Sequence, residues 1–151
     1  MAITNPECIA AARLGTNPSV ICRVPSGWAA MCDMQYLSGY TILLSDPVVA
    51  SINNLDYLQR AVFLNDMTLI GDALLEVTGA YRINYCILGN SDSYLHAHII
   101  PRFLSEPEKL RKGGPWSYPK KLQDEAIFDF ERDKELMQQI AAAIRKRLAK
   151  G

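Results

Sequence analysis

The stretch SYLHAHIIPR, residues 93–102, contains both histidines of this chain, separated by one alanine in an otherwise apolar run. Alternate residues of a β-strand share one face of that strand. In an extended conformation, one face therefore carries Tyr94, His96, His98 and Ile100. The other face carries Leu95, Ala97 and Ile99, an apolar set typical of a buried core face. The two imidazoles then point to a common side, ~7 Å apart along the strand.

Three interpretations of this histidine pair remain open on spacing alone. The first is a pair of hydrogen-bonded or surface histidines without a chemical role. The second is a zinc site, which needs a third ligand from a distant Asp, Glu or Cys. The third is phosphoryl or nucleotidyl chemistry, in which a neutral imidazole is the nucleophile and its neighbour donates a proton or a hydrogen bond. An ordinary imidazole titrates near pH 6.5, so its unprotonated form is available at neutral pH.

The flanking sequence predicts an antiparallel sheet with helices. Strand-like runs occupy 19–24, 28–34, 39–45, 81–88 and 94–100. Turn residues separate the first three runs, which predict a meander, and the last two predict a hairpin. Helical patterns occupy 5–13, 55–77 and 131–149. The stretch 101–119 contains four prolines and two glycines and predicts a loop.

The long helix at 55–77 has a wide apolar arc. Its expected core stripe is Phe63, Met67, Ile70, Leu74 and Val77. Asn54 is the expected N-cap, and Gly79 is expected to end the helix in the left-handed conformation. Three further apolar residues lie off the stripe: Leu58, Val62 and Leu69. Because a solvated second face would leave these three as an apolar patch, we predict a homodimer.

Charge and composition disfavour several classes of protein. Sixteen Lys and Arg balance sixteen Asp and Glu, so the formal net charge is zero. A protein that binds a nucleic-acid polymer through its phosphates normally has a basic excess, so such a partner is not expected. No run approaches the length of a membrane span, the start does not read as a secretory leader, and the four cysteines form no CxxC pair. We therefore expect one domain, residues 1–151, in a cytoplasmic protein without membrane association.

Several separated segments resemble the histidine triad (HIT) superfamily. The run INYCILGNSDSYLHAHIIPR, residues 83–102, is similar to the signature His-φ-His-φ-His-φ-φ, often followed by Pro-Arg, where φ is apolar. It resembles most a bacterial branch of HIT hydrolases. The resemblance extends back through MCDMQYLSGYTILLSDPVV at 31–49 and forward to PWSYP at 115–119. It covers about residues 15–119, so the helix at 131–149 is a C-terminal extension.

This resemblance implies a fold and an activity. The fold is a HIT-like α+β fold, with an antiparallel sheet of about five strands on which the long helix and the C-terminal helix pack, usually as a homodimer. The activity is hydrolysis or transfer of a nucleotide at its α-phosphate, through a nucleotidyl-histidine intermediate. The implied partner is a nucleotide as small-molecule substrate, and neither a cofactor nor a metal ion is implied.

Residues of this chain that match the signature are expected to have the roles that the family's residues have at those positions. His96 matches the nucleophile, and His98 matches the last histidine of the triad, which contacts the scissile phosphate. Asn90 and Ser91 match phosphate-binding positions, and the loop that contains them can aim amide groups at phosphate oxygens. Two further candidates fall in the segment that lines the nucleoside pocket in this family: Asp33 and Gln35.

The first triad position holds Tyr94 in place of histidine. A tyrosine supplies one hydroxyl hydrogen bond, so Tyr94 is kept as a candidate nucleotide- or phosphate-binding residue, but it cannot act as an imidazole. This departure keeps a second function open, a non-catalytic nucleotide-binding or regulatory protein. Arg102 either reaches the phosphates or makes a structural ion pair, and we leave it out of the site. Trp28 is expected in the core, whereas Trp116 in the polar loop is a candidate for stacking on a base.

Overall fold

Residues 6–151, which the computed structural model describes, contain one five-stranded antiparallel sheet. The strands are β1 (Val20–Val24), β2 (Gly27–Met31), β3 (Thr41–Ser45), β4 (Arg82–Cys86) and β5 (His96–Arg102). Their order across the sheet is β1-β2-β3-β5-β4, and every neighbouring pair is antiparallel. The predicted meander and hairpin are both present, so the predicted α+β fold with about five strands is confirmed.

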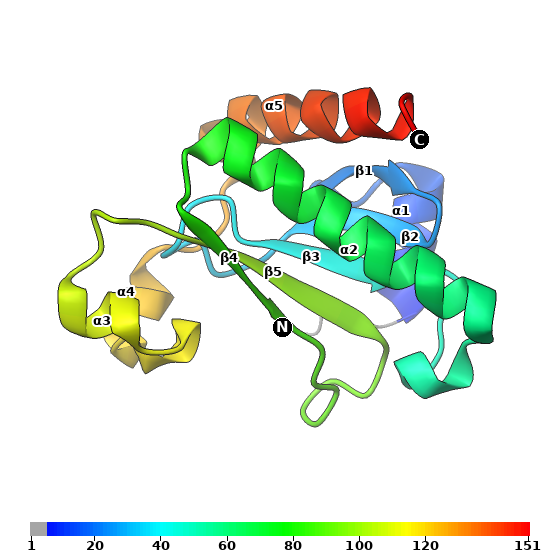
Figure 1. Cartoon of the computed structure of the whole chain (residues 1–151), viewed down its shortest axis with the longest axis horizontal. Helices are drawn as coiled ribbons and strands as arrows, with labels where there is room; N and C mark the ends of the chain where they lie inside the picture. The colour runs from blue at the N-terminus through cyan, green and yellow to red at the C-terminus, as the bar shows by residue number, and fades with distance from the viewer. Residues whose placement is uncertain (1–5) are drawn as a thin grey trace.

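Helices cover the sheet unequally. The α-helices are α1 (Pro6–Leu14), α2 (Tyr57–Thr78), α3 (Glu108–Lys112), α4 (Lys120–Glu125) and α5 (Phe130–Leu148). Two short 3-10 turns are η1 (Ile52–Asn54) and η2 (Pro115–Ser117). The long helices α2 and α5 contact each other and the sheet, whereas the short helices α3 and α4 lie together at one end of the molecule (Figure 1).

The two faces of the sheet contribute to two separate apolar clusters. The larger cluster joins one face to α2 and α5, and its strand residues include Leu43, Ala97 and Ile99. The smaller cluster lies on the other face and includes Ile42, Leu44, Ile100 and, from α1, Ile9. Leu95 and Ala97 are buried in the larger cluster, so the predicted apolar face of the histidine strand is confirmed. His96 and His98 consequently lie on the face that α2 and α5 do not cover.

The start of α2 corrects one expectation, and its end confirms another. Asp56, not Asn54, is the N-cap: its carboxylate accepts from the Gln59 amide, and the Gln59 side chain accepts from the Asp56 amide. Asn54 instead takes part in a capping box at the start of η1. Both residue types cap helices well, so local preference could not choose between them. Gly79 ends α2 in the left-handed region, at φ 71°, as predicted.

The apolar arc of α2 is partly accounted for within the chain. Leu69 packs against the larger core cluster, so it needs no partner subunit. Leu58 and Val62 remain exposed. The homodimer therefore stays a prediction that depends on these two side chains. No helix within residues 6–151 has the length and apolar character needed to cross a bilayer.

The stretch 101–119 contains more regular structure than predicted. Its first two residues extend β5, and α3 and η2 follow within it. The prolines favoured a loop, but proline is tolerated at the start of a helix, and Pro107 is the residue immediately before α3. The following residues, 120–125, form α4.

Candidate active site

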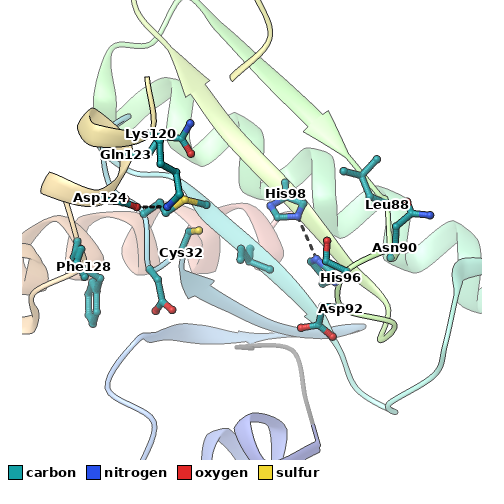
Figure 2. Close-up of a pocket in the computed structure, with 16 residues that line it drawn as sticks. Cys32, Leu88, Asn90, Asp92, His96, His98, Lys120, Gln123, Asp124 and Phe128 are labelled. Carbon is teal, nitrogen blue, oxygen red and sulfur yellow. Dashed lines mark hydrogen bonds and ion pairs between the residues drawn. The ribbon is translucent and has the colours of Figure 1, made fainter. Parts of the chain in front are cut away.

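A cavity of about 750 Å³ opens on the face of the sheet that carries the histidines. One part of its wall is the loop 88–92 together with His96 and His98. A second part is the segment 32–34 after β2, together with Ile42. A third part comes from the segment 120–128, through Lys120, Gln123, Asp124, Ile127 and Phe128 (Figure 2). The cavity thus joins the predicted histidine site to a segment beyond the signature region.

His96 is held in one tautomer by the backbone. Its Nδ1 lies 2.7 Å from the carbonyl oxygen of Tyr94. A carbonyl oxygen only accepts hydrogen bonds, so Nδ1 carries the hydrogen and Nε2 of the neutral ring keeps its lone pair. His96 is 6% exposed, and its ring borders the cavity. The side chain therefore offers a nucleophilic nitrogen in a fixed orientation.

His98 continues this arrangement into a directed chain of hydrogen bonds. Its Nε2 lies 3.2 Å from Nε2 of His96, and its Nδ1 lies 2.6 Å from the hydroxyl oxygen of Tyr40. Since Nε2 of His96 is an acceptor, Nε2 of His98 must be the donor, and Nδ1 of His98 then accepts from the Tyr40 hydroxyl. The order of donation is Tyr40 to His98, His98 to His96, and His96 to the Tyr94 carbonyl (Figure 2 shows the histidine pair).

The surroundings of His98 keep its ring neutral. Burial, and then the neighbouring His96, lower the pKa of His98 from 6.5 to about 4. The ring of Trp116 lies edge-on to it, with ring centroids 5.4 Å apart, and Tyr40 packs on it at 5.8 Å. Burial also raises the pKa of Tyr40, so its hydroxyl stays protonated and remains a donor. At neutral pH both ends of the hydrogen bond between Tyr40 and His98 are uncharged.

The structure brings most of the predicted site residues to one cavity. Asn90 and Ser91 line it from the loop 88–92, and Asp33 lines it from the segment that follows β2. Partial burial raises the pKa of the Asp33 carboxyl. These three positions are compatible with the roles predicted for them, phosphate contacts for the loop pair and a nucleoside contact for the carboxylate.

Two predicted site residues lie elsewhere. Gln35 is buried outside the cavity wall, where its amide donates to the carbonyls of Cys32 and Tyr40 and accepts from the amide of Gly39. It therefore closes the turn between β2 and β3. The side chain of Tyr94 does not line the cavity; Tyr94 contacts His96 through its backbone carbonyl.

Several residues of the site were not anticipated from the sequence. Tyr40 joins the hydrogen-bond chain because β3 pairs with β5 in a register that sets Thr41 opposite Ile99. The segment around Ile127 reaches the cavity because it pairs with Met34 in a short antiparallel bridge. Cys32 also lines the cavity, but burial raises the pKa of its thiol to about 12, which excludes a thiolate nucleophile.

Metal-binding geometry is not found in the part of the chain that the structure describes. Within residues 6–151, no three His, Cys, Asp or Glu side chains are grouped so that they could hold a metal ion. The Nε2 atoms of the two histidines instead face each other at hydrogen-bond distance.

Comparisons with solved structures identify the architecture. No protein-family model and no curated protein matches this chain at the sequence level. A histidine triad protein from Sinorhizobium meliloti aligns over 87% of this chain and 93% of its own, at TM-score 0.69 and 23% identity. A histidine triad protein from Marinobacter aquaeolei aligns over 89% and 94%, at TM-score 0.70 and 18% identity.

A third similar structure is an enzyme. Diadenosine triphosphate hydrolase from Plasmodium falciparum, solved in complex with Cyclomarin A, aligns over 85% of this chain and 78% of its own, at TM-score 0.62 and 16% identity. At these identities the shared feature is the arrangement of the backbone. The five-stranded antiparallel sheet and its helices therefore have the fold of the histidine triad proteins.

Proposed function

We propose that this protein is a histidine triad hydrolase or nucleotidyl transferase that acts at the α-phosphate of a nucleotide, through a nucleotidyl-His96 intermediate. The observation that carries the proposal is the lone pair on Nε2 of His96, held at a cavity by the hydrogen bond from Nδ1 to the Tyr94 carbonyl. Within this proposal, the chain belongs to the bacterial hydrolase branch and has Tyr94 at the first triad position.

The reaction has two steps. In the first, Nε2 of His96 forms a bond to the α-phosphorus while the bond to the leaving group breaks and its electron pair goes to the leaving group. Positive charge then develops on the imidazole, and the Tyr94 carbonyl stabilises it by accepting from Nδ1. In the second step, the oxygen of water or of an acceptor alcohol forms a bond to the phosphorus and loses its proton to solvent, while the bond between phosphorus and Nε2 breaks and its electron pair returns to Nε2.

His98 acts in this reaction as a hydrogen-bond donor and not as a source of protons. Its neutral ring can lose the Nε2 hydrogen only by forming an imidazolate or by taking the proton of Tyr40. Burial disfavours both anions, as the raised pKa of Tyr40 illustrates. When a phosphate group displaces the contact between the two rings, Nε2–H of His98 is free to stabilise the charge on the phosphate oxygens.

In this proposal the nucleoside lies along the same face of the sheet as the histidines and extends from β5 toward β2. Ile42 of β3 is opposite His98, and Ala30 of β2 is opposite Ile42. Two strand spacings separate β5 from β2, about 10 Å, which is long enough for a ribose and part of a base. Asp33, just beyond β2, then supplies a carboxylate for the ribose hydroxyls, and Ile42 supplies an apolar floor.

The proposal is tested by offering adenylated and guanylated compounds, including dinucleoside polyphosphates and nucleoside phosphoramidates, and measuring the release of nucleoside monophosphate. Turnover by the parent protein that disappears in His96→Ala supports it. Nucleotide binding without turnover of any compound contradicts it and favours the non-catalytic alternative that Tyr94 keeps open.

A further inference from the structure

We propose that the buried ion pair of Arg102 and Glu106 is a positioning element for the histidine pair, because it holds segment 103–118 so that Trp116 stays against His98. This inference rests on the proposed function for its catalytic meaning. Its structural part does not depend on that function, since it concerns only how segment 103–118 covers the imidazole of His98.

Arg102 has no hydrogen-bond donor left for a substrate. It is 2% exposed, and its guanidinium donates from Nε and Nη2 to Glu106 and from Nη1 to the side chain of Asn84. The remaining N–H groups donate to the backbone carbonyls of Leu110, Arg111 and Gly113. A guanidinium has five N–H donors, and this set of acceptors uses all of them. Of the two roles open from the sequence, the structural ion pair is the one observed.

These acceptors fold the segment back on the end of β5. Arg102 is the last residue of β5, and the three carbonyls lie 8 to 11 positions farther along the chain. Glu106 accepts in addition from the backbone amide of Phe103 and from the hydroxyl of Tyr118, at 2.6 and 2.7 Å. One buried carboxylate thus binds the beginning and the end of the same segment.

A second anchor fixes the residue next to Trp116. The hydroxyl of Tyr36 donates to the carbonyl of Pro115 at 2.7 Å, and its ring packs on that of Tyr118, with ring centroids 5.1 Å apart. Arg102 anchors Gly113 and Tyr36 anchors Pro115 before Trp116, and the bond from Tyr118 to Glu106 anchors the chain after it. Trp116 as a residue is still 38% exposed. Its position therefore depends on these backbone anchors more than on burial.

The consequence for His98 is the loss of water from one side of its ring. Trp116 covers His98 edge-on, and Tyr40, the residue immediately before β3, covers another side. The titratable groups in contact with His98 are His96 on its own strand and Tyr40, while Trp116 carries no charge. The charged residues that line the same cavity are Asp33, Asp92, Lys120 and Asp124. Since burial is the main cause of the lowered pKa of His98, removing the cover should raise it.

The test measures the pKa of His98 directly, by NMR titration of the two imidazoles in the full chain. In the parent, the pKa of His98 is expected below 5. Trp116→Ala removes the cover without touching the ion pair and should raise this pKa by about one pH unit. Arg102→Lys keeps the charge but supplies three donors in place of five, so it should release the segment and raise the pKa to a similar extent.

Arg147→Lys is the matched control. Arg147 pairs with Glu76 between α5 and α2, on the opposite side of the sheet, so its substitution should leave the pKa of His98 unchanged. A folded Arg102→Lys protein, judged by circular dichroism, with the parent pKa at His98 would overturn the proposal. So would an unchanged pKa in Trp116→Ala.

Tyr118→Phe decides the matter if Arg102→Lys does not fold. It deletes only the hydroxyl that binds Glu106, so a smaller rise in the pKa of His98 supports the proposal and no rise contradicts it. If the parent turns over nucleotides, kcat should fall in these variants while KM changes little, because the cover acts on His98 and not on the nucleoside. Absence of turnover in the parent would refute the proposed function, whereas the titration would still test the positioning role.

Discussion

The two faces of β5 differ in what covers them. Ala97 and Ile99 on one face are fully buried in the cluster that includes the long helices α2 and α5. His96 and His98 on the other face border a cavity whose walls are mostly loops and short helices. One strand thus contributes to a closed core on one side and places both histidines at a cavity on the other.

Within the seven residues of β5, one face therefore contributes to the stability of the fold and the other supplies the groups of the proposed reaction. A larger side chain on the covered face has no space to occupy, so such a substitution should lower the free energy of unfolding. A change on the cavity face removes a functional group next to empty space and should act mainly on turnover. The following predictions test whether the separation holds, from the largest expected effect to the smallest.

His96→Ala should reduce turnover at least ~10³-fold, because no other group can form the covalent intermediate. The free energy of unfolding should change little by comparison, since the lost ring borders the cavity. Steady-state kinetics and urea denaturation of the same preparation measure the two quantities. A large loss of stability with retained turnover would show that His96 serves the fold and not the reaction.

Acidification should weaken the fold through His98. Its pKa is about 4 in the folded protein and 6.5 when unperturbed, so between these values the unfolded chain binds a proton that the folded protein does not. This contribution to stability is complete above pH 6.5 and is lost as the pH falls toward 4, by up to about 3 kcal/mol. Denaturation at a series of pH values should show this slope in the parent and a flatter one in His98→Phe.

His98→Ala should lower kcat by ~10²-fold, because it removes a hydrogen bond that strengthens in the transition state. Nucleotide affinity should change only modestly. Comparison of kcat with KM for a single substrate separates the two effects. A variant with raised KM and unchanged kcat would show that His98 only binds the substrate.

Ala97→Leu places three additional carbon atoms on the covered face, between the two histidines in sequence. Overpacking of a closed core typically costs ~1–3 kcal/mol, so the free energy of unfolding should fall by that amount. Chemical denaturation measures it. A protein with parent stability would mean that this face is less tightly covered than the structure shows.

Tyr40→Phe and Tyr94→Phe form the finest comparison, since each deletes one hydroxyl. Tyr40 donates to Nδ1 of His98, whereas the documented contribution of Tyr94 is its carbonyl, which the substitution keeps. Tyr40→Phe should therefore reduce kcat more than Tyr94→Phe, with the latter effect below ~10-fold. Equal effects would show that the hydroxyl of Tyr94 takes part as well.

Local patterns predicted the division between the two faces but not the residues that complete the site. Alternation along 94–100 is a property of the strand itself, so it could be read directly. Tyr40 contacts a histidine 58 positions away, and only the pairing of β3 with β5 brings the two together. The bridge between Met34 and Ile127 likewise depends on where a distant segment folds back. Contacts of this kind are set by register and loop geometry, which leave no periodic signal.

Gln35 shows the opposite case, a residue that was predicted in the site and lies outside the cavity wall. The resemblance to the histidine triad superfamily implied a nucleoside contact for Gln35, and Asp33, two residues earlier, does line the cavity. The amide of Gln35 instead satisfies three backbone groups of the turn that leads into β3. The resemblance pointed to a segment that borders the cavity through Asp33, but the direction of the Gln35 side chain required the structure.

The most direct test of the central claim is a search for nucleotide bound covalently to His96. The parent protein, mixed with a substrate found to release nucleoside monophosphate, is quenched within milliseconds under alkaline conditions that preserve phosphoramidates, and its peptides are analysed by mass spectrometry. We expect the mass of one nucleotidyl group on the peptide that contains His96, and none on His98 or in His96→Ala. Efficient turnover without that adduct, or an adduct confined to another residue, would contradict the account.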